Sequence, residues 1–236
     1  MNARRLLRST PVLILTVAIV ILGPSLLANA QERVIYNFQG APDGVSSYAD
    51  LIMDAKGNLY GTTKYGGTGT CATADGPITC GTVFRLSPPS TTGGAWTETI
   101  LYNFLGPSGD GEWPQAPLRL DKNGNLYGTT TAGGNATIRA SGNFNAGCGT
   151  VFQLSPPAQG GGAWTKTTLY NFQDNGDGYI PVGRLAMDAK GNLYGVTVLD
   201  STAGLGLIYR LSPPAQIGGS WTETVLYKFQ GSGDGS

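Results

Sequence analysis

A repeat of about 67 residues constrains this chain more than any other feature of its sequence. The pentapeptide Gly-Asn-Leu-Tyr-Gly begins at residues 57, 124 and 191, so both intervals are 67 residues. Leu-Ser-Pro-Pro and Trp-Thr recur three times in the same order, and a Tyr-x-Phe segment recurs at Tyr36, Tyr102, Tyr170 and Tyr227. Collinear motifs that share one period indicate tandem structural units.

The sequence of each unit predicts four short strands. The candidate segments are rich in Val, Ile, Leu, Thr, Tyr and Phe and are separated by turn residues. In the first unit they are residues 49–54, 58–63, 81–87 and 96–104. After residue 30 no stretch has a convincing helical period, and the 37 Gly and 14 Pro residues interrupt every candidate helix. The sequence therefore predicts an all-β fold.

Four antiparallel strands repeated in this way are typical of a β-propeller blade. We expect a propeller-like domain over residues 31–236, with about three four-stranded blades in units of roughly 39–104, 105–172 and 173–229. A stacked β-solenoid and a β-sandwich are alternatives, although solenoid coils commonly repeat every ~20–30 residues.

The number of blades predicts an incomplete ring. Closed propellers have about 4–8 blades, and residues 34–38 match the last strand of a unit, which commonly closes such a ring. We therefore expect the natural protein to continue beyond residue 236. An open arc of three blades and a ring closed by oligomerisation are the alternatives.

The first 30 residues predict a secretory signal peptide. Arg4, Arg5 and Arg8 form a basic start, residues 11–22 are almost wholly apolar, and Ala28-Asn29-Ala30 resembles a cleavage site. The apolar run is shorter than the ~20 residues of a spanning helix. We expect an exported chain in the extracellular space, at the cell surface or in the periplasm, with no transmembrane span after cleavage. An uncleaved anchor and twin-arginine export are alternatives.

Composition excludes several classes of function. The chain has no histidine, which excludes Ser-His-Asp and Cys-His catalysis and His-ligated zinc. After residue 30 there are 12 basic and 15 acidic residues, a balance of about −3. A nucleic-acid partner would need a basic face, so none is expected. No catalytic residue is predicted, and the enzyme question stays open with a leaning toward no.

The loops between units predict a binding face. The connections between the second and third strands are long and differ among units, whereas the tight turns repeat. In a four-stranded meander these variable connections share one end of the sheet with the unit-to-unit loops. Binding residues concentrate in loops on a rigid scaffold. The candidate face comprises Asp43, Asp110 and Asp177, each followed by Gly, and the aromatic residues Trp113 and Tyr179, interpreted as occupying corresponding places.

Simpler interpretations exist for the same residues. Asp-Gly is a common turn sequence, and the two aromatic residues are also suited to packing over their loops. A calcium site would need 6–8 oxygen ligands, and the loops lack the spacing of an EF-hand. We therefore expect no metal and no cofactor, with calcium left open.

The three cysteines have different expected roles. Cys71 and Cys80 lie in one loop of an exported chain, which predicts a disulfide. Cys148 matches Cys80 by repeat position but has no second cysteine in its loop. It is either a buried thiol or the partner of a group outside this chain.

The motif DGxxPxAxLxxDxxGNLYGTT…GTVFxLSP…ETxLYxF resembles the GloVer tandem-repeat family of secreted bacterial proteins, over nearly all of residues 34–236. The piece LxxDxxGNLY is also similar to NHL and lactonase-type propellers. The resemblance implies an exported surface protein and supplies no catalytic residues. We expect a secreted or surface scaffold that binds a glycan or a protein. A structural surface protein without a small-molecule site, and a propeller hydrolase or lyase, are the alternatives.

Overall fold

The computed structural model describes residues 32–73, 76–106, 109–135, 147–158, 161–200, 204–216, 218–231 and 233–234. The predicted signal peptide lies outside them. All regular structure in these residues is β, and the described strands belong to one compact unit, residues 35–236. None of the described segments forms a helix with the length and hydrophobicity needed to cross a bilayer.

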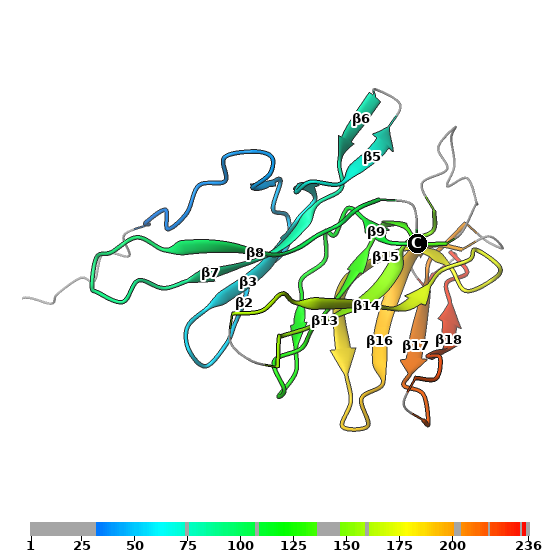
Figure 1. Ribbon diagram of the computed structural model, residues 1–236. Coiled ribbons are helices and arrows are strands. Elements are labelled where there is room, and N and C mark those ends of the chain that lie inside the picture. Colours follow the sequence, from blue (N-terminus) through cyan, green and yellow to red (C-terminus); the bar gives the residue numbers. More distant parts are fainter. Residues whose placement is uncertain are drawn as a thin grey trace, which may run out of the picture. The chain divides into compact units, whose positions relative to one another are not determined.

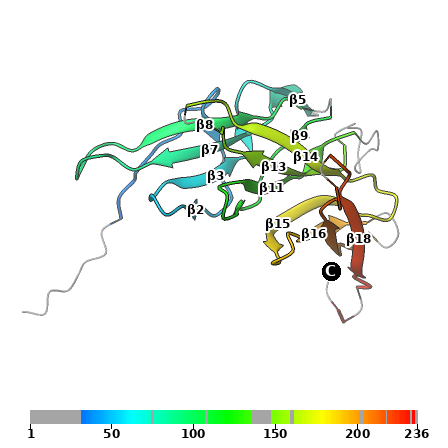
Figure 2. The ribbon, with the colours of Figure 1, turned by 60° about the horizontal axis from the view of Figure 1, so that its bottom comes forward.

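Three four-stranded antiparallel sheets follow one another along the chain, and in each the strands lie side by side in chain order (Figure 1; Figure 2). The first sheet contains β2 (Ile52–Met53), β3 (Leu59–Thr63), β7 (Thr82–Ser87) and β8 (Thr97–Asn103). The second contains β10 (Arg119–Leu120), β11 (Leu126–Thr130), β13 (Thr150–Ser155) and β14 (Thr165–Asn171). The third contains β15 (Tyr179–Met187), β16 (Leu193–Leu199), β17 (Leu207–Ser212) and β18 (Thr222–Lys228). The expected four strands per unit are therefore present.

The two ends of each sheet differ. One end, the turn end, carries the two tight turns, such as those between β2 and β3 and between β7 and β8. The opposite end, the loop end, carries the longer connections. There β1 (Gly44–Val45) pairs with β4 (Tyr65–Gly66), and β9 (Gly111–Glu112) pairs with β12 (Ala132–Gly133). In the third unit the same extension is continuous, because β15 and β16 pair along their whole length around one irregularity.

Three local expectations differ from the structure. The first strand of each of the first two units shrinks to two residues, β2 and β10. Residues 34–38 are irregular, because no described strand pairs with them, although Phe38 still packs edge-on against Phe84 with ring centroids 5.1 Å apart. The first variable loop contains a hairpin, β5 (Thr70–Thr73) and β6 (Gly76–Thr79), that the sequence pattern did not predict.

The second glycine of the Gly-Asn-Leu-Tyr-Gly motif makes room for an aromatic ring. Gly128 lies directly opposite Phe152 in the strand register, and a Cβ at Gly128 would lie 2.6 Å from the ring. Gly61 faces Phe84 and Gly195 faces Tyr209 in the same way. A ring that covers a cross-strand glycine helps to fix the register of a sheet. A β-bulge follows at one position in the pairing of the third and fourth strands of every sheet.

Among the described residues, one hydrophobic cluster lies between each pair of consecutive sheets. The first joins residues such as Val83 and Phe104 to Leu126 and Phe152, and the second repeats the pattern one unit later. Phe104 meets Phe152 edge-on at 5.2 Å, and Phe172 meets Tyr209 at 5.1 Å. Each sheet thus buries apolar side chains on the faces that meet its neighbours, which is the packing expected of successive repeat units.

Candidate functional site

The aspartate at the turn end of each sheet organises a tight turn. Asp54 Oδ1 accepts hydrogen bonds from the amides of Lys56 and Asn58, at 2.8 and 2.9 Å. Its Oδ2 accepts from Asn58 Nδ2 at 2.8 Å and from the Tyr60 hydroxyl at 3.0 Å. Burial alone would raise the pKa of Asp54, but these hydrogen bonds outweigh it and lower the pKa. The same contacts recur at the equivalent aspartates, Asp121 and Asp188.

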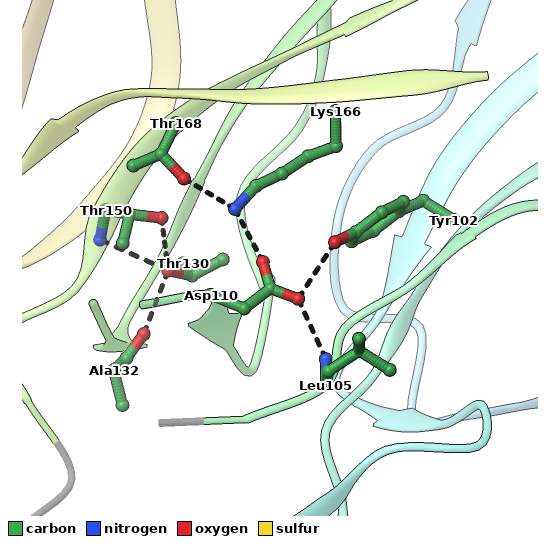
Figure 3. A network of polar contacts seen from close by, with 8 residues as sticks. All are labelled: Tyr102, Leu105, Asp110, Thr130, Ala132, Thr150, Lys166 and Thr168. Carbon is green, nitrogen blue, oxygen red and sulfur yellow. Dashed lines mark hydrogen bonds and ion pairs between the residues drawn. The ribbon is translucent and has the colours of Figure 1, made fainter. Parts of the chain in front are cut away.

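The loop-end aspartates also serve turns. Asp110 Oδ2 accepts the Tyr102 hydroxyl at 2.9 Å and the Leu105 amide at 2.9 Å (Figure 3). Asp43 and Asp177 accept a tyrosine hydroxyl and a preceding amide in the same manner, at 2.8–3.0 Å for the shortest contacts. These carboxylates face inward, and Asp177 is only 4% exposed. Their oxygens are engaged by the protein itself, as the turn interpretation expects.

The residue that faces each loop-end aspartate from the next sheet differs among units. In the second sheet it is Lys166, whose Nζ lies 2.5 Å from Asp110 Oδ1 and 2.6 Å from Thr168 Oγ1 (Figure 3). The first and third sheets have Glu98 and Glu223 at this strand position. Burial raises the pKa of both glutamates to about 7, and the charges of Asp43 and Asp177 respectively add to the rise.

Trp113 lines a pocket at the loop end. The pocket has a volume of about 250 Å³ and is lined by Trp113, Gln115, Thr131, Ala132, Gly147, Ile180 and Val182. Gln115 Nε2 donates to Thr131 Oγ1 at 3.1 Å, whereas Trp113 Nε1 is buried and has no hydrogen-bond partner among the described residues. The pocket is therefore lined mainly by apolar and aromatic side chains, with the polar side chains of Gln115 and Thr131.

The two predicted aromatic residues do not occupy corresponding places. Trp113 has φ = 57° and its amide donates to the Cys80 carbonyl, and Ile180 has φ = 57° and donates to the Cys148 carbonyl. Trp113 therefore corresponds to Ile180, and Tyr179 corresponds to Glu112. The two predicted aromatic residues are one position apart in the repeat. The structure brings Trp113 and Ile180 together in the pocket and leaves Tyr179 outside its lining.

Glu112 is a buried carboxyl beside this pocket. Its side chain is 1% exposed, and it pairs across the strands with Ala132, a pocket residue. Burial raises the pKa of Glu112 to about 7. This environment was not predicted, because a single Glu after Asp-Gly does not reveal how deeply its side chain is buried.

The cysteines lie deep in the structure. Cys71 and Cys80 form a disulfide that joins β5 to the residue after β6, and both residues belong to the first hydrophobic cluster. Cys148 is a free, buried thiol. Burial and the charges of Asp174 and Asp177 raise the pKa of Cys148 to about 11. In the described part of the chain, no three acidic or cysteine side chains gather as a metal site requires.

Comparison with known proteins identifies the family. Residues 26–236 match the Gloeobacter/Verrucomicrobia repeat. The chain belongs to this repeat family. The match confirms the GloVer-type resemblance of the repeated motif. None of the curated proteins matches the chain significantly.

A crystal structure of a protein of unknown function from Dyadobacter fermentans is similar to this GloVer-type chain. The similarity has a TM-score of 0.42 and 13% sequence identity. It covers 74% of this chain and 49% of the other, so this chain spans about half the length of that structure.

Proposed function

We propose that this repeat protein is an exported, propeller-like scaffold that binds a ligand, a glycan or a protein, at its loop end. Three successive four-stranded meanders, packed through two equivalent hydrophobic clusters, support blades of a propeller-like arrangement. The basic, apolar and small-residue pattern of residues 1–30 supports export.

The Trp113 pocket is the observation that carries the binding proposal. An aromatic residue and an apolar wall next to the polar side chains of Gln115 and Thr131 suit a ligand that is both flat and polar. A volume of about 250 Å³ suits one sugar ring or one large side chain of a partner rather than a whole cofactor.

A glycan array with the purified chain tests this function. We expect selective binding that Trp113→Ala abolishes while the melting temperature stays close to that of the parent. Ser46→Ala is the matched control, because Ser46 occupies the same backbone position in the first unit, with φ = 59°. Binding that survives Trp113→Ala would contradict the assignment. An absence of any ligand would favour the structural alternative, and turnover of a lactone or polysaccharide panel would favour the enzyme alternative.

A further inference from the structure

Two equivalent grooves lie at the turn end, between consecutive sheets. The first, of about 560 Å³, lies between the first and second sheets, and the second, of about 660 Å³, lies between the second and third. Both volumes fall within the ~300–1,000 Å³ range of ligand sites. In each groove one sheet contributes an aspartate–tyrosine pair and the next contributes a tryptophan and a proline: Asp54, Tyr60, Trp164 and Pro156, or Asp121, Tyr127, Trp221 and Pro213.

Each groove also contains one arginine beside its tyrosine, supplied from a different strand. In the first groove Arg85 on β7 lies directly opposite Tyr60 in the register. In the second groove the β13 position is Gln153, and Arg119 on β10 lies opposite Tyr127 instead. Each groove therefore has an arginine next to its tyrosine, supplied by the third strand of the first sheet and by the first strand of the second sheet.

These arginines have no carboxylate partner among the described residues, although Arg85 interacts with the hydroxyl of Tyr60. Arg85 and Arg119 form no ion pair there, and the Nε of each is buried without a hydrogen-bond acceptor. The neighbouring Asp54 and Asp121 stay charged but accept hydrogen bonds from their own turns, and no ion pair among the described residues joins them to the arginines. The Nε of Arg210, which lines neither groove, is buried in the same way, so the position in a groove distinguishes Arg85 and Arg119. There the remaining N–H groups of each guanidinium suit an anionic acceptor.

The other residues of each groove favour a saccharide that bears an acidic group. The first groove contains one acidic and two basic residues, and the second contains two acidic and three basic residues, so each has a net charge of +1. Trp164 and Trp221 are only partly buried, and Tyr60 and Trp164 meet at 6.3 Å. A guanidinium binds a carboxylate or sulfate through paired N–H groups, and an aromatic wall contacts the apolar face of a pyranose ring.

We propose that the two turn-end grooves bind acidic saccharides, with Arg85 and Arg119 holding the acidic group and Trp164 and Trp221 contacting the ring. Two equivalent grooves on one chain suit a polymer with a repeated acidic unit, which gains affinity by occupying both. This site lies at the opposite end of the sheets from the Trp113 pocket and does not depend on it.

Calorimetric titration of the purified chain tests the proposal. The probes are polygalacturonate and alginate as carboxylated polymers, chondroitin sulfate as a sulfated polymer, dextran as a neutral polymer, and poly-glutamate as a non-sugar polyanion. We expect carboxylated or sulfated saccharides to bind, and the stronger of the two defines the acidic group. Dextran and poly-glutamate are expected to bind at least about tenfold more weakly, and added salt should weaken the saccharide complex.

Variants distinguish binding in the grooves from nonspecific attraction to positive charge. Arg85→Gln and Arg119→Gln should each weaken saccharide binding by about tenfold, and the double variant should abolish it. Arg210→Gln is the matched control, because Arg210 holds the Arg85 position in the third sheet but lines neither groove. The melting temperature of each variant shows whether the variant still folds. Saccharide binding that the double variant retains, equal binding of poly-glutamate, or binding of no acidic saccharide would each overturn the proposal.

Discussion

The repeated aspartates illustrate how single residues hold the three units together. At the turn end each aspartate closes a hairpin turn, and at the loop end each one binds the hydroxyl of a preceding tyrosine and the amide of the following loop. Asp110 has an additional role, because Lys166 reaches it from a strand 56 residues later in the sequence. The side chains of Lys166 and Asp110 are 7% and 12% exposed, so this ion pair is nearly buried.

Removing Lys166 should destabilise the fold strongly. Lys166→Ala leaves the buried carboxylate of Asp110 without its cation, and breaking such a pair costs about 3–5 kcal/mol. Urea denaturation measures this as a lower midpoint with an unchanged slope. Lys56→Ala, at an exposed turn position, is the control and should change the free energy of unfolding by less than ~0.5 kcal/mol. An equal effect of both substitutions would contradict the assigned role of the ion pair.

At the scale of the element, register and loop closure depend on a few backbone positions. Glycine opposite an aromatic ring recurs in all three sheets, and the bulge in the pairing of the third and fourth strands recurs with it. The hairpin β5–β6 is different, because it belongs to the first unit alone among the described residues and is held by a disulfide.

Gly128→Ala should disturb the second sheet. The new Cβ would lie 2.6 Å from the Phe152 ring and 2.9 Å from Leu118, so the ring must move. Overpacking of a closed core costs about 1–3 kcal/mol, which thermal unfolding would report as a lower melting temperature. In the Phe152→Leu background, where the ring is absent, Gly128→Ala should lower stability by less than it does in the parent protein. Strictly additive effects would argue against direct contact.

Breaking the disulfide should loosen the first variable loop. The bond spans a sequence separation of 9 residues, and the chain-entropy relation gives a stabilisation of about 2–3 kcal/mol for a loop of this size. Cys71→Ser with Cys80→Ser should lower stability by that amount and expose residues 70–79 to limited proteolysis. Cleavage confined to other loops would contradict this expectation.

The packing of consecutive sheets is the feature of the whole molecule that joins these elements. The packing buries carboxyl groups as well as apolar side chains, and three glutamates acquire raised pKa values from burial. Glu98 faces Asp43 and Tyr36. Glu223 faces Asp177, Tyr170 and Tyr209, with Lys228 opposing the rise.

Stability should fall as the pH rises from about 4.5 to 7. Each of these carboxyl groups has a pKa of about 7 in the folded state and 4.5 in the unfolded state, so the folded state binds more protons between these pH values. The stabilisation from the protonated carboxyl is therefore complete below pH 4.5 and is lost by about pH 7. Melting temperatures should therefore be higher at pH 5 than at pH 8. Glu98→Gln with Glu223→Gln should flatten the decline, with Glu112 retaining part of it. An unchanged profile in the double variant would contradict the assignment.

Export should leave Gln31 at the new N-terminus. The small residues Ala28 and Ala30 satisfy the requirement of signal peptidase. Expression of the full chain in a bacterial secretion host, followed by N-terminal sequencing, measures the cleavage site. Ala30→Leu should block processing, whereas Asn29→Gln should not. A chain that retains residues 1–30 would favour the anchor instead.

The sequence by itself determined the repeat, the four strands of each unit, their turns and the family. These properties are local, because strand periodicity and Asp, Asn and Gly turn chemistry act over a few residues. It did not reveal the β5–β6 hairpin or the irregular course of residues 34–38, which depend on which partners are available to pair.

Only the tertiary structure decided which repeated residues face inward and which face a pocket. The cover over Glu112 and the arrival of Arg85 and Arg119 from different strands at equivalent grooves arise where two sheets meet. The offset between Trp113 and Tyr179, in contrast, is present in the sequence, where they are the third residue after Asp110 and the second after Asp177. Burial, pKa and the pairing of Lys166 with Asp110 depend on distances between residues far apart in the chain, and a one-dimensional pattern does not contain those distances.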